Sequence, residues 1–152
     1  MNLYQEVILD HNKKPRNWGT LENPTHQAEG LNPLCGDRIW LMLKVSDESI
    51  VDIAVEGESC AICKASASMM TMSVKGKTIK LAEELTSVFR KMVVGNHGGS
   101  DKKQLGGLKV FQGIKDLPSR VKCAVLPWHT LQAAVNSQKQ ISTEGVDDPM
   151  SS

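Results

Sequence analysis

The hydrophobic pattern of this chain changes from strand-like to helical spacing after Gly57, and that change most limits the folds open to it. Before Gly57, apolar residues alternate with polar ones, as in Val51, Ile53 and Val55, which is typical of a half-buried strand. After it, apolar side chains recur at helical spacing. Strands followed by helices predict an α+β fold, with helices packed on one side of a small antiparallel sheet.

The pattern also predicts where the elements lie. Strands are expected at residues 39–45 and 50–55, joined by a polar turn, and helices over 2–13, over 60–74, from Thr78 onward and from Pro118 onward. Five glycines between positions 95 and 107 predict a surface loop. We expect a single domain over residues 1–136 and a disordered polar tail over residues 137–152.

Charge and hydropathy argue against several classes of partner. The 152 residues include 18 basic and 17 acidic ones, so there is no cationic excess for a nucleic acid. No apolar run approaches the roughly 20 residues that span a bilayer. The first residues, MNLYQEVILDHNKK, lack the apolar core of a signal peptide. We therefore expect a cytoplasmic protein, with no nucleic-acid or membrane partner, whose four cysteines stay reduced.

Three of the cysteines lie near the ends of predicted elements. Cys35 occupies the turn NPLCGD, Cys60 begins a helix, and Cys123 lies in the first turns of the last helix. Thiolates are soft ligands that suit zinc or iron–sulfur iron, and Asp37 would lie on the same side as Cys35 if the segment is extended. The residues alone leave a second interpretation open, in which the cysteines are small core residues.

Four sequence blocks then carry a resemblance: LYQEVILDHNKKPRNWG, NPLCGD, GESCAICKASASMM and SRVKCAVLPWHTL. They resemble, in the same order and over roughly residues 1–135, the signature blocks of the SufU/IscU family of iron–sulfur cluster assembly proteins, which are related to the N-terminal part of NifU. The resemblance implies a SufE/NifU-like (IscU-like) fold. It also implies a metal or cluster site formed by three cysteines at one end of the sheet.

Two features make the chain more similar to the SufU branch than to the IscU branch. IscU scaffolds have a histidine before the last cysteine, where this chain has Lys122, and the long segment between Cys60 and Cys123 resembles the SufU insertion. The resemblance implies that Cys35, Asp37, Cys60 and Cys123 bind zinc. It further implies a SufS-like, pyridoxal-phosphate-dependent cysteine desulfurase as sulfur donor, and downstream iron–sulfur assembly proteins as recipients.

We hypothesise that Cys35 is the catalytic sulfur acceptor. Zinc would keep its thiol deprotonated, and the thiolate would attack the outer sulfur of the desulfurase persulfide in a step like thiol–disulfide exchange. One alternative is a scaffold that uses the same residues to assemble a transient [2Fe–2S] cluster on bound iron. Another is a non-catalytic partner of the desulfurase in which zinc only stabilises the fold.

Three further residues are possible auxiliaries. Cys63 forms a C-A-I-C motif with Cys60, and we expect a packed thiol there, although a substitute ligand or a redox role is also open. Arg38 and Lys122 flank proposed ligands. They would either steer an anionic persulfide or serve as ordinary surface charges.

Overall fold

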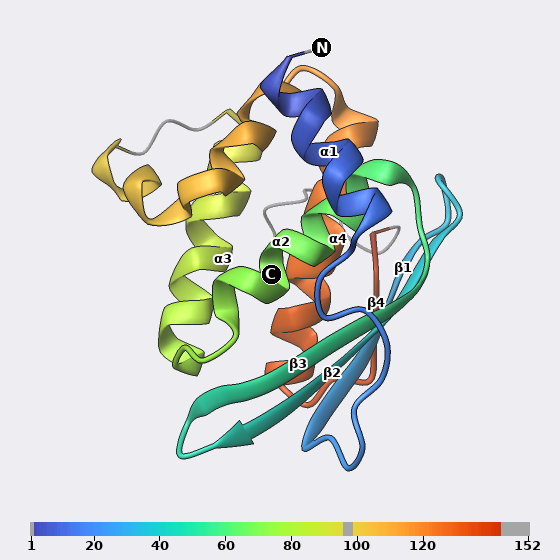
Figure 1. Ribbon diagram of the computed structural model, residues 1–152, viewed down its shortest axis with the longest axis vertical. Coiled ribbons are helices and arrows are strands. Elements are labelled where there is room, and N and C mark those ends of the chain that lie inside the picture. Colours follow the sequence, from blue (N-terminus) through green and yellow to red (C-terminus); the bar gives the residue numbers. More distant parts are fainter. Residues whose placement is uncertain (1, 96–98, 144–152) are drawn as a thin grey trace.

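The computed structural model describes residues 2–95 and 99–143, and Figure 1 shows how their helices and strands are arranged. In chain order the elements are α1 (Leu3–Lys13), β1 (His26–Asn32), β2 (Asp37–Ser46), β3 (Ser49–Glu58), α2 (Ala61–Val74), α3 (Ile79–Val93), the 3-10 segment η1 (Gly99–Ile114), α4 (Pro118–Val135) and β4 (Gln140–Ser142).

The four strands form one sheet in the order β3-β2-β1-β4. The two expected strands lie within β2 and β3, which pair antiparallel with Leu41 opposite Val55. β1 pairs antiparallel with the other side of β2, whereas β4 runs parallel to β1, with Ile141 opposite Gly30. The predicted fold class is confirmed, and the parallel edge strand makes the sheet mixed rather than purely antiparallel.

The helices gather on one side of the sheet (Figure 1). α4 lies against β1 and β2, and α2 packs against α4. Alternate residues of β2, namely Ile39, Leu41 and Leu43, are buried beneath these helices, as a strand with one covered face requires. On the helical side, the Trp128 ring stacks on Phe89 with the ring centroids 4.8 Å apart, and both side chains are fully buried.

Local sequence signals fix where the helices begin. The Asn2 side chain accepts a hydrogen bond from the Gln5 amide at 2.8 Å and starts α1, and the Thr78 hydroxyl accepts one from the Leu81 amide at 3.1 Å and starts α3. Both bonds satisfy amide groups that have no partner within the first turn of a helix. Pro118 lies in the first turn of α4, where its missing N–H costs nothing.

Two segments differ from the sequence-based expectation. The expected tail begins at residue 137, but residues 140–142 form β4, because their backbone pairs with the free edge of β1. Residues 99–107 of the expected loop belong to η1, in which Leu105, Leu108 and Phe111 reach the core. The remaining parts of the two predictions, residues 96–98 and 144–152, lie outside the described residues.

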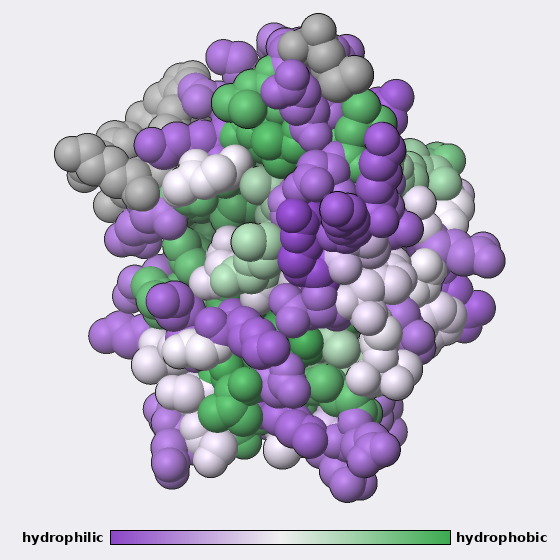
Figure 2. All heavy atoms as spheres, in the orientation of Figure 1, coloured by the Kyte–Doolittle hydropathy of each residue, from purple (hydrophilic) through white to green (hydrophobic). Residues whose placement is uncertain are grey.

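The surface of the molecule carries a mixture of hydrophilic and apolar side chains. On the face shown in Figure 2, hydrophilic side chains alternate with smaller apolar areas. Within the described part of the chain, no helix combines the length and the apolar character that crossing a bilayer demands.

Gly30 lets α4 come close to the sheet. A Cβ atom at this position would lie 2.0 Å from Thr130 Oγ1 and 3.2 Å from Leu126 Cδ1. Thr130 cannot easily move away, since its side chain is buried and its hydroxyl donates a hydrogen bond to the Leu126 carbonyl at 2.8 Å. The distance between β1 and α4, the helix that carries Cys123, therefore depends on the absence of a side chain here.

We predict that Gly30→Ala lowers the free energy of unfolding by about 1–3 kcal/mol, the usual cost of overpacking a core. Gly113→Ala is the matched control, because a Cβ there meets nothing within 4 Å. The control should leave stability unchanged or raise it by less than about 1 kcal/mol. Chemical denaturation of both variants measures the difference, and equal effects would show that β1 and α4 do not require this close approach.

Candidate metal centre

Cys35, Asp37 and Cys123 bring their potential ligand atoms together at one end of the sheet. These atoms all lie within 4.8 Å of one another, and the two sulfur atoms are 3.3 Å apart. Cys35 comes from the turn between β1 and β2, Asp37 from the first position of β2, and Cys123 from α4. The fold thus brings Cys123 beside Cys35, which lies 88 residues earlier in the sequence, and beside its near neighbour Asp37.

Cys60 adds a fourth donor from the start of α2. Its amide donates a 2.7 Å hydrogen bond to Asp37 Oδ1, and its Sγ lies 3.8 Å from Asp37 Oδ2. Cys60 is also the N-cap of α2, since its sulfur accepts a hydrogen bond from the Cys63 amide at 3.4 Å. The side chain is therefore oriented by the end of the helix as well as by Asp37.

Glycines allow the backbone to reach these positions. Gly36 has a φ of 72°, a left-handed conformation that lets the turn place Cys35 beside Asp37. Gly57 has a φ of 133°, and a Cβ there would lie 2.1 Å from the Arg38 carbonyl oxygen. The end of β3, which leads into Cys60, therefore lies directly against the beginning of β2.

The donors differ in their exposure to solvent. Cys35 is exposed and its neighbour Leu34 is 68% exposed, whereas Cys60 is half-buried and Cys123 is buried. Asp37 is only 2% exposed. One thiol of the group can thus be reached from outside the molecule while the others lie behind it.

A hydrogen bond between two of the thiols makes their pKa values differ in the metal-free chain. The hydrogen bond that Cys123 donates lowers the pKa of the Cys60 thiol to about 7, assisted by the amides of Cys63 and Ile62 and opposed by burial and by Asp37. The same hydrogen bond raises the pKa of the Cys123 thiol, and burial adds to this. Of these two residues, Cys60 therefore has the more acidic thiol.

This donor set fits a zinc ion. Two thiolates that share a zinc ion at about 2.3 Å lie about 3.8 Å apart in a tetrahedron, and the sulfur atoms of Cys35 and Cys123 are 3.3 Å apart here. Three sulfur donors are soft ligands, and one carboxylate oxygen completes the four that zinc commonly takes. The same set also fits the iron of a small cluster.

Asn32 is a polar neighbour of the site that sequence reasoning assigned only to a turn. It is fully buried at the last position of β1, and its Nδ2 lies 3.3 Å from Asp37 Oδ2 and 3.6 Å from Cys123 Sγ. The signal that could have found it is its register. Ala28, Gly30 and Asn32 form the buried side of β1, and Asn32 is the only one of the three with a polar side chain.

The structure separates the possible auxiliaries. Arg38 points to the other face of β2, where it pairs with Glu29 and lies over the Trp40 ring at 4.7 Å from the centroid. Lys122 is half-buried on α4 next to Cys123. Cys63 is fully buried, and burial raises the pKa of its thiol well above the ordinary value. These positions place Arg38 away from the group of donors.

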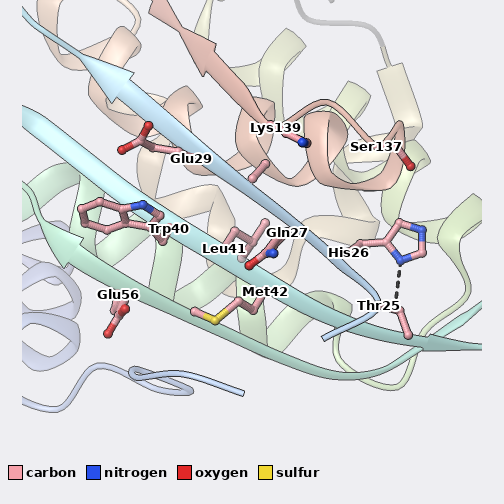
Figure 3. Close-up of a pocket in the computed structure, with 11 residues that line it drawn as sticks. Thr25, His26, Gln27, Glu29, Trp40, Leu41, Met42, Glu56, Ser137 and Lys139 are labelled. Carbon is pink, nitrogen blue, oxygen red and sulfur yellow. Dashed lines mark hydrogen bonds between the residues drawn. The ribbon is translucent and has the colours of Figure 1, made fainter. Parts of the chain in front are cut away.

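A hollow of about 690 Å³ lies on the open face of the sheet, shown in Figure 3. Its lining includes Trp40, Glu29 and Met42 on the strands and Lys139 before β4, and none of the proposed ligands. It is therefore separate from the cluster of thiols.

Comparisons with known proteins show the family to which this chain is similar. The NifU-like N-terminal domain family matches residues 3–124. The chain is 42% identical over 137 residues to the zinc-dependent sulfurtransferase SufU of Bacillus subtilis strain 168, covering 90% of this chain and 92% of that protein. It is 38% identical over 134 residues to the iron–sulfur cluster assembly scaffold protein IscU of Streptococcus pyogenes serotype M1, covering 88% and 83%.

A solved structure has the same fold. It is described as a candidate iron–sulfur cluster assembly scaffold protein for the SUF system from Fervidobacterium islandicum AW-1, with a TM-score of 0.81 and 37% identity. The match covers 86% of this chain and 94% of that one.

The difference in exposure predicts the order in which the thiols of the metal-free protein react. We expect iodoacetamide to modify Cys35 in the folded protein, because it is exposed, and Cys63 only as fast as the domain unfolds, because it is fully buried. Mass spectrometry with peptide fragmentation measures both rates. All four cysteines should react equally in denaturant. Equal rates for Cys35 and Cys63 in the folded protein would contradict the placement of Cys63.

Proposed function

This chain belongs to the family of NifU-like N-terminal domains, and from this premise we propose that it serves iron–sulfur cluster assembly as a zinc-binding sulfur acceptor. It would take the outer sulfur of a persulfide on a SufS-like, pyridoxal-phosphate-dependent cysteine desulfurase and pass it to downstream assembly proteins. The observation that carries this proposal is the exposure of Cys35 on its glycine turn, beside donors that are half-buried or buried.

Four residues would hold the zinc ion in this proposal: Cys35, Asp37, Cys60 and Cys123. Bound zinc favours the deprotonated form of the thiols that ligate it at neutral pH. A purely structural zinc site is usually closed by four Cys or His ligands. The carboxylate of Asp37 and the exposed turn that carries Cys35 therefore favour a site that takes part in chemistry.

The proposed transfer needs one nucleophile and one leaving group. The Cys35 thiolate attacks the outer sulfur of the desulfurase persulfide, a new S–S bond forms on Cys35, and the old S–S bond breaks. The desulfurase cysteine leaves as a thiolate, so charge and electrons balance without an added oxidant. The reaction requires reduced cysteines, which agrees with the cytoplasmic location expected from the sequence.

A second candidate function is a scaffold for a transient [2Fe–2S] cluster on the same residues, and the similarity to a protein named as an IscU scaffold favours it. Lys122 favours the sulfur acceptor, because a protonated lysine has no lone pair with which to replace a histidine ligand. The higher identity to SufU, 42% against 38%, also favours the acceptor.

The decisive experiment titrates the protein with a SufS-type desulfurase and cysteine, and follows sulfide release and metal content together. We expect a protein with one zinc ion and no cluster that strongly stimulates turnover and gains one sulfur atom on Cys35 by mass spectrometry. Cys35→Ser should lose this sulfur and the stimulation, while Cys63→Ala should keep both. A Cys35→Ser variant that still gains sulfur normally would contradict the assignment of Cys35.

The same titration distinguishes the alternatives. Weak stimulation with a coloured cluster on the protein would support the scaffold. Stimulation of the desulfurase without any sulfur on Cys35 would support a non-catalytic partner.

Zinc binding itself is tested with two cysteines from one turn of α2. We predict that Cys60→Ala weakens zinc affinity by more than about 100-fold, since loss of an outer-shell contact alone costs 10- to 100-fold. Cys63→Ala should bind zinc with an affinity within about 10-fold of the unmodified protein, because its thiol is packed in the core. Competition with a chromophoric chelator measures both affinities. A larger loss for Cys63→Ala than for Cys60→Ala would reverse the assignment of the ligand.

A further inference from the structure

Both polar groups of the Asn32 side chain form hydrogen bonds. These bonds connect the cluster of thiols to the residue that follows the last strand, β4. Nδ2 donates to Asp37 Oδ2 at 3.3 Å and to Cys123 Sγ at 3.6 Å. Oδ1 accepts a hydrogen bond from the Thr143 hydroxyl at 3.0 Å. Asn32 and Thr143 are 111 residues apart in the chain, and Thr143 directly follows β4.

The orientation of this amide is determined by its neighbours. A carboxylate can only accept hydrogen bonds, so the NH₂ group of Asn32 must face Asp37. Its carbonyl oxygen then faces Thr143, whose hydroxyl must donate. The Asn32 side chain therefore has one orientation that satisfies all of its partners.

Burial makes these contacts costly to lose. Asn32 is 0% exposed and Thr143 is 6% exposed. A buried polar group without a partner bears its full cost of desolvation, so breaking one contact weakens the others that share the amide. Asn32 is thus positioned to fix both Asp37 and Cys123, which belong to different elements.

We propose that Asn32 is a positioning residue of the metal site and that Thr143 holds it in place, so that metal binding and the docking of β4 are coupled. This inference rests on the proposed zinc site. Metal-binding residues are oriented by hydrogen bonds from their neighbours, and Asn32 donates such bonds to two proposed ligands. Because coupling between two sites is reciprocal, zinc must stabilise the docked β4 as much as β4 strengthens zinc binding.

The first test measures zinc affinity by chelator competition in two single variants, the double variant and one control. Asn32→Ala should weaken binding about 10- to 100-fold. Thr143→Val keeps the shape of the side chain but removes the donor, and should weaken binding about 2- to 10-fold, the range for one hydrogen bond. In the Asn32→Ala background, Thr143→Val should have no further effect, because the atom it serves is gone.

The matched control is Thr86→Val. Thr86 is also buried, and its hydroxyl donates to the Ala82 carbonyl within α3 at 2.8 Å. It should change stability but not zinc affinity. A general loss of stability would weaken zinc binding in Thr86→Val and Thr143→Val alike. Only a specific role of Thr143 would lower the zinc affinity of Thr143→Val and leave that of Thr86→Val unchanged.

The second test is hydrogen–deuterium exchange in β4, which does not depend on activity. Zinc should slow the exchange of amides in residues 140–142 in the unmodified protein, and do so much less in Thr143→Val. If Asn32→Ala does not fold, this comparison and the zinc affinity of Thr143→Val still decide the matter.

The outcomes separate the two proposals. An unmodified protein that binds no zinc would overturn the proposed metal site. An unmodified protein that binds zinc, together with Asn32→Ala and Thr143→Val variants of unchanged affinity and unchanged β4 exchange, would overturn the positioning role alone.

Discussion

The buried carboxylate of Asp37 is the constraint on which this end of the molecule depends. A carboxylate with 2% exposure must be hydrogen-bonded, because an unpaired buried charge is far too costly. Two donors bind this carboxylate: the backbone N–H of Cys60 at the start of α2 and the side-chain NH₂ group of Asn32 at the end of β1. Satisfying this one side chain therefore brings the end of β1 and the beginnings of β2 and α2 to the same place.

The same arrangement divides the thiols by role. Cys60 lies at the start of α2 and Cys123 lies within α4, two helices that pack together, while Cys35 lies on an exposed turn at Gly36. A group that must hold an ion benefits from rigid ligands, and a group that must accept sulfur from another protein has to be reachable. The proposed function uses both properties at once.

Much of the fold could be predicted, because it rests on local signals. The alternation of Val51, Ile53 and Val55 predicted the strand β3, and the cap at Thr78 predicted α3. Val51 is nevertheless exposed, unlike Ile53 and Val55, because the pairing of β3 with β2 shifts register at this position. β4 could not be predicted in this way, because its three residues have no pattern typical of a strand. They form one only because the edge of β1 is free to pair with them. The same holds for residues 99–107, whose 3-10 turns pack Leu105 into the core.

For the site, the resemblance of the sequence blocks indicated Cys35, Asp37, Cys60 and Cys123, and the structure places these residues together, while their binding of metal stays a prediction. The direction of Arg38 was not available from the sequence. It follows from the alternation of β2, which turns Arg38 to the open face when Asp37 faces the helices.

The sequence by itself determined the fold class, the helix starts and the candidate donor residues, because periods, caps and short motifs act over a few neighbouring positions. Only the tertiary structure decided which groups surround those donors. Asn32 meets Thr143 across 111 residues, and Cys63 is buried although it lies one helical turn from Cys60. Such contacts depend on how whole elements pack, and no local pattern in the chain encodes them.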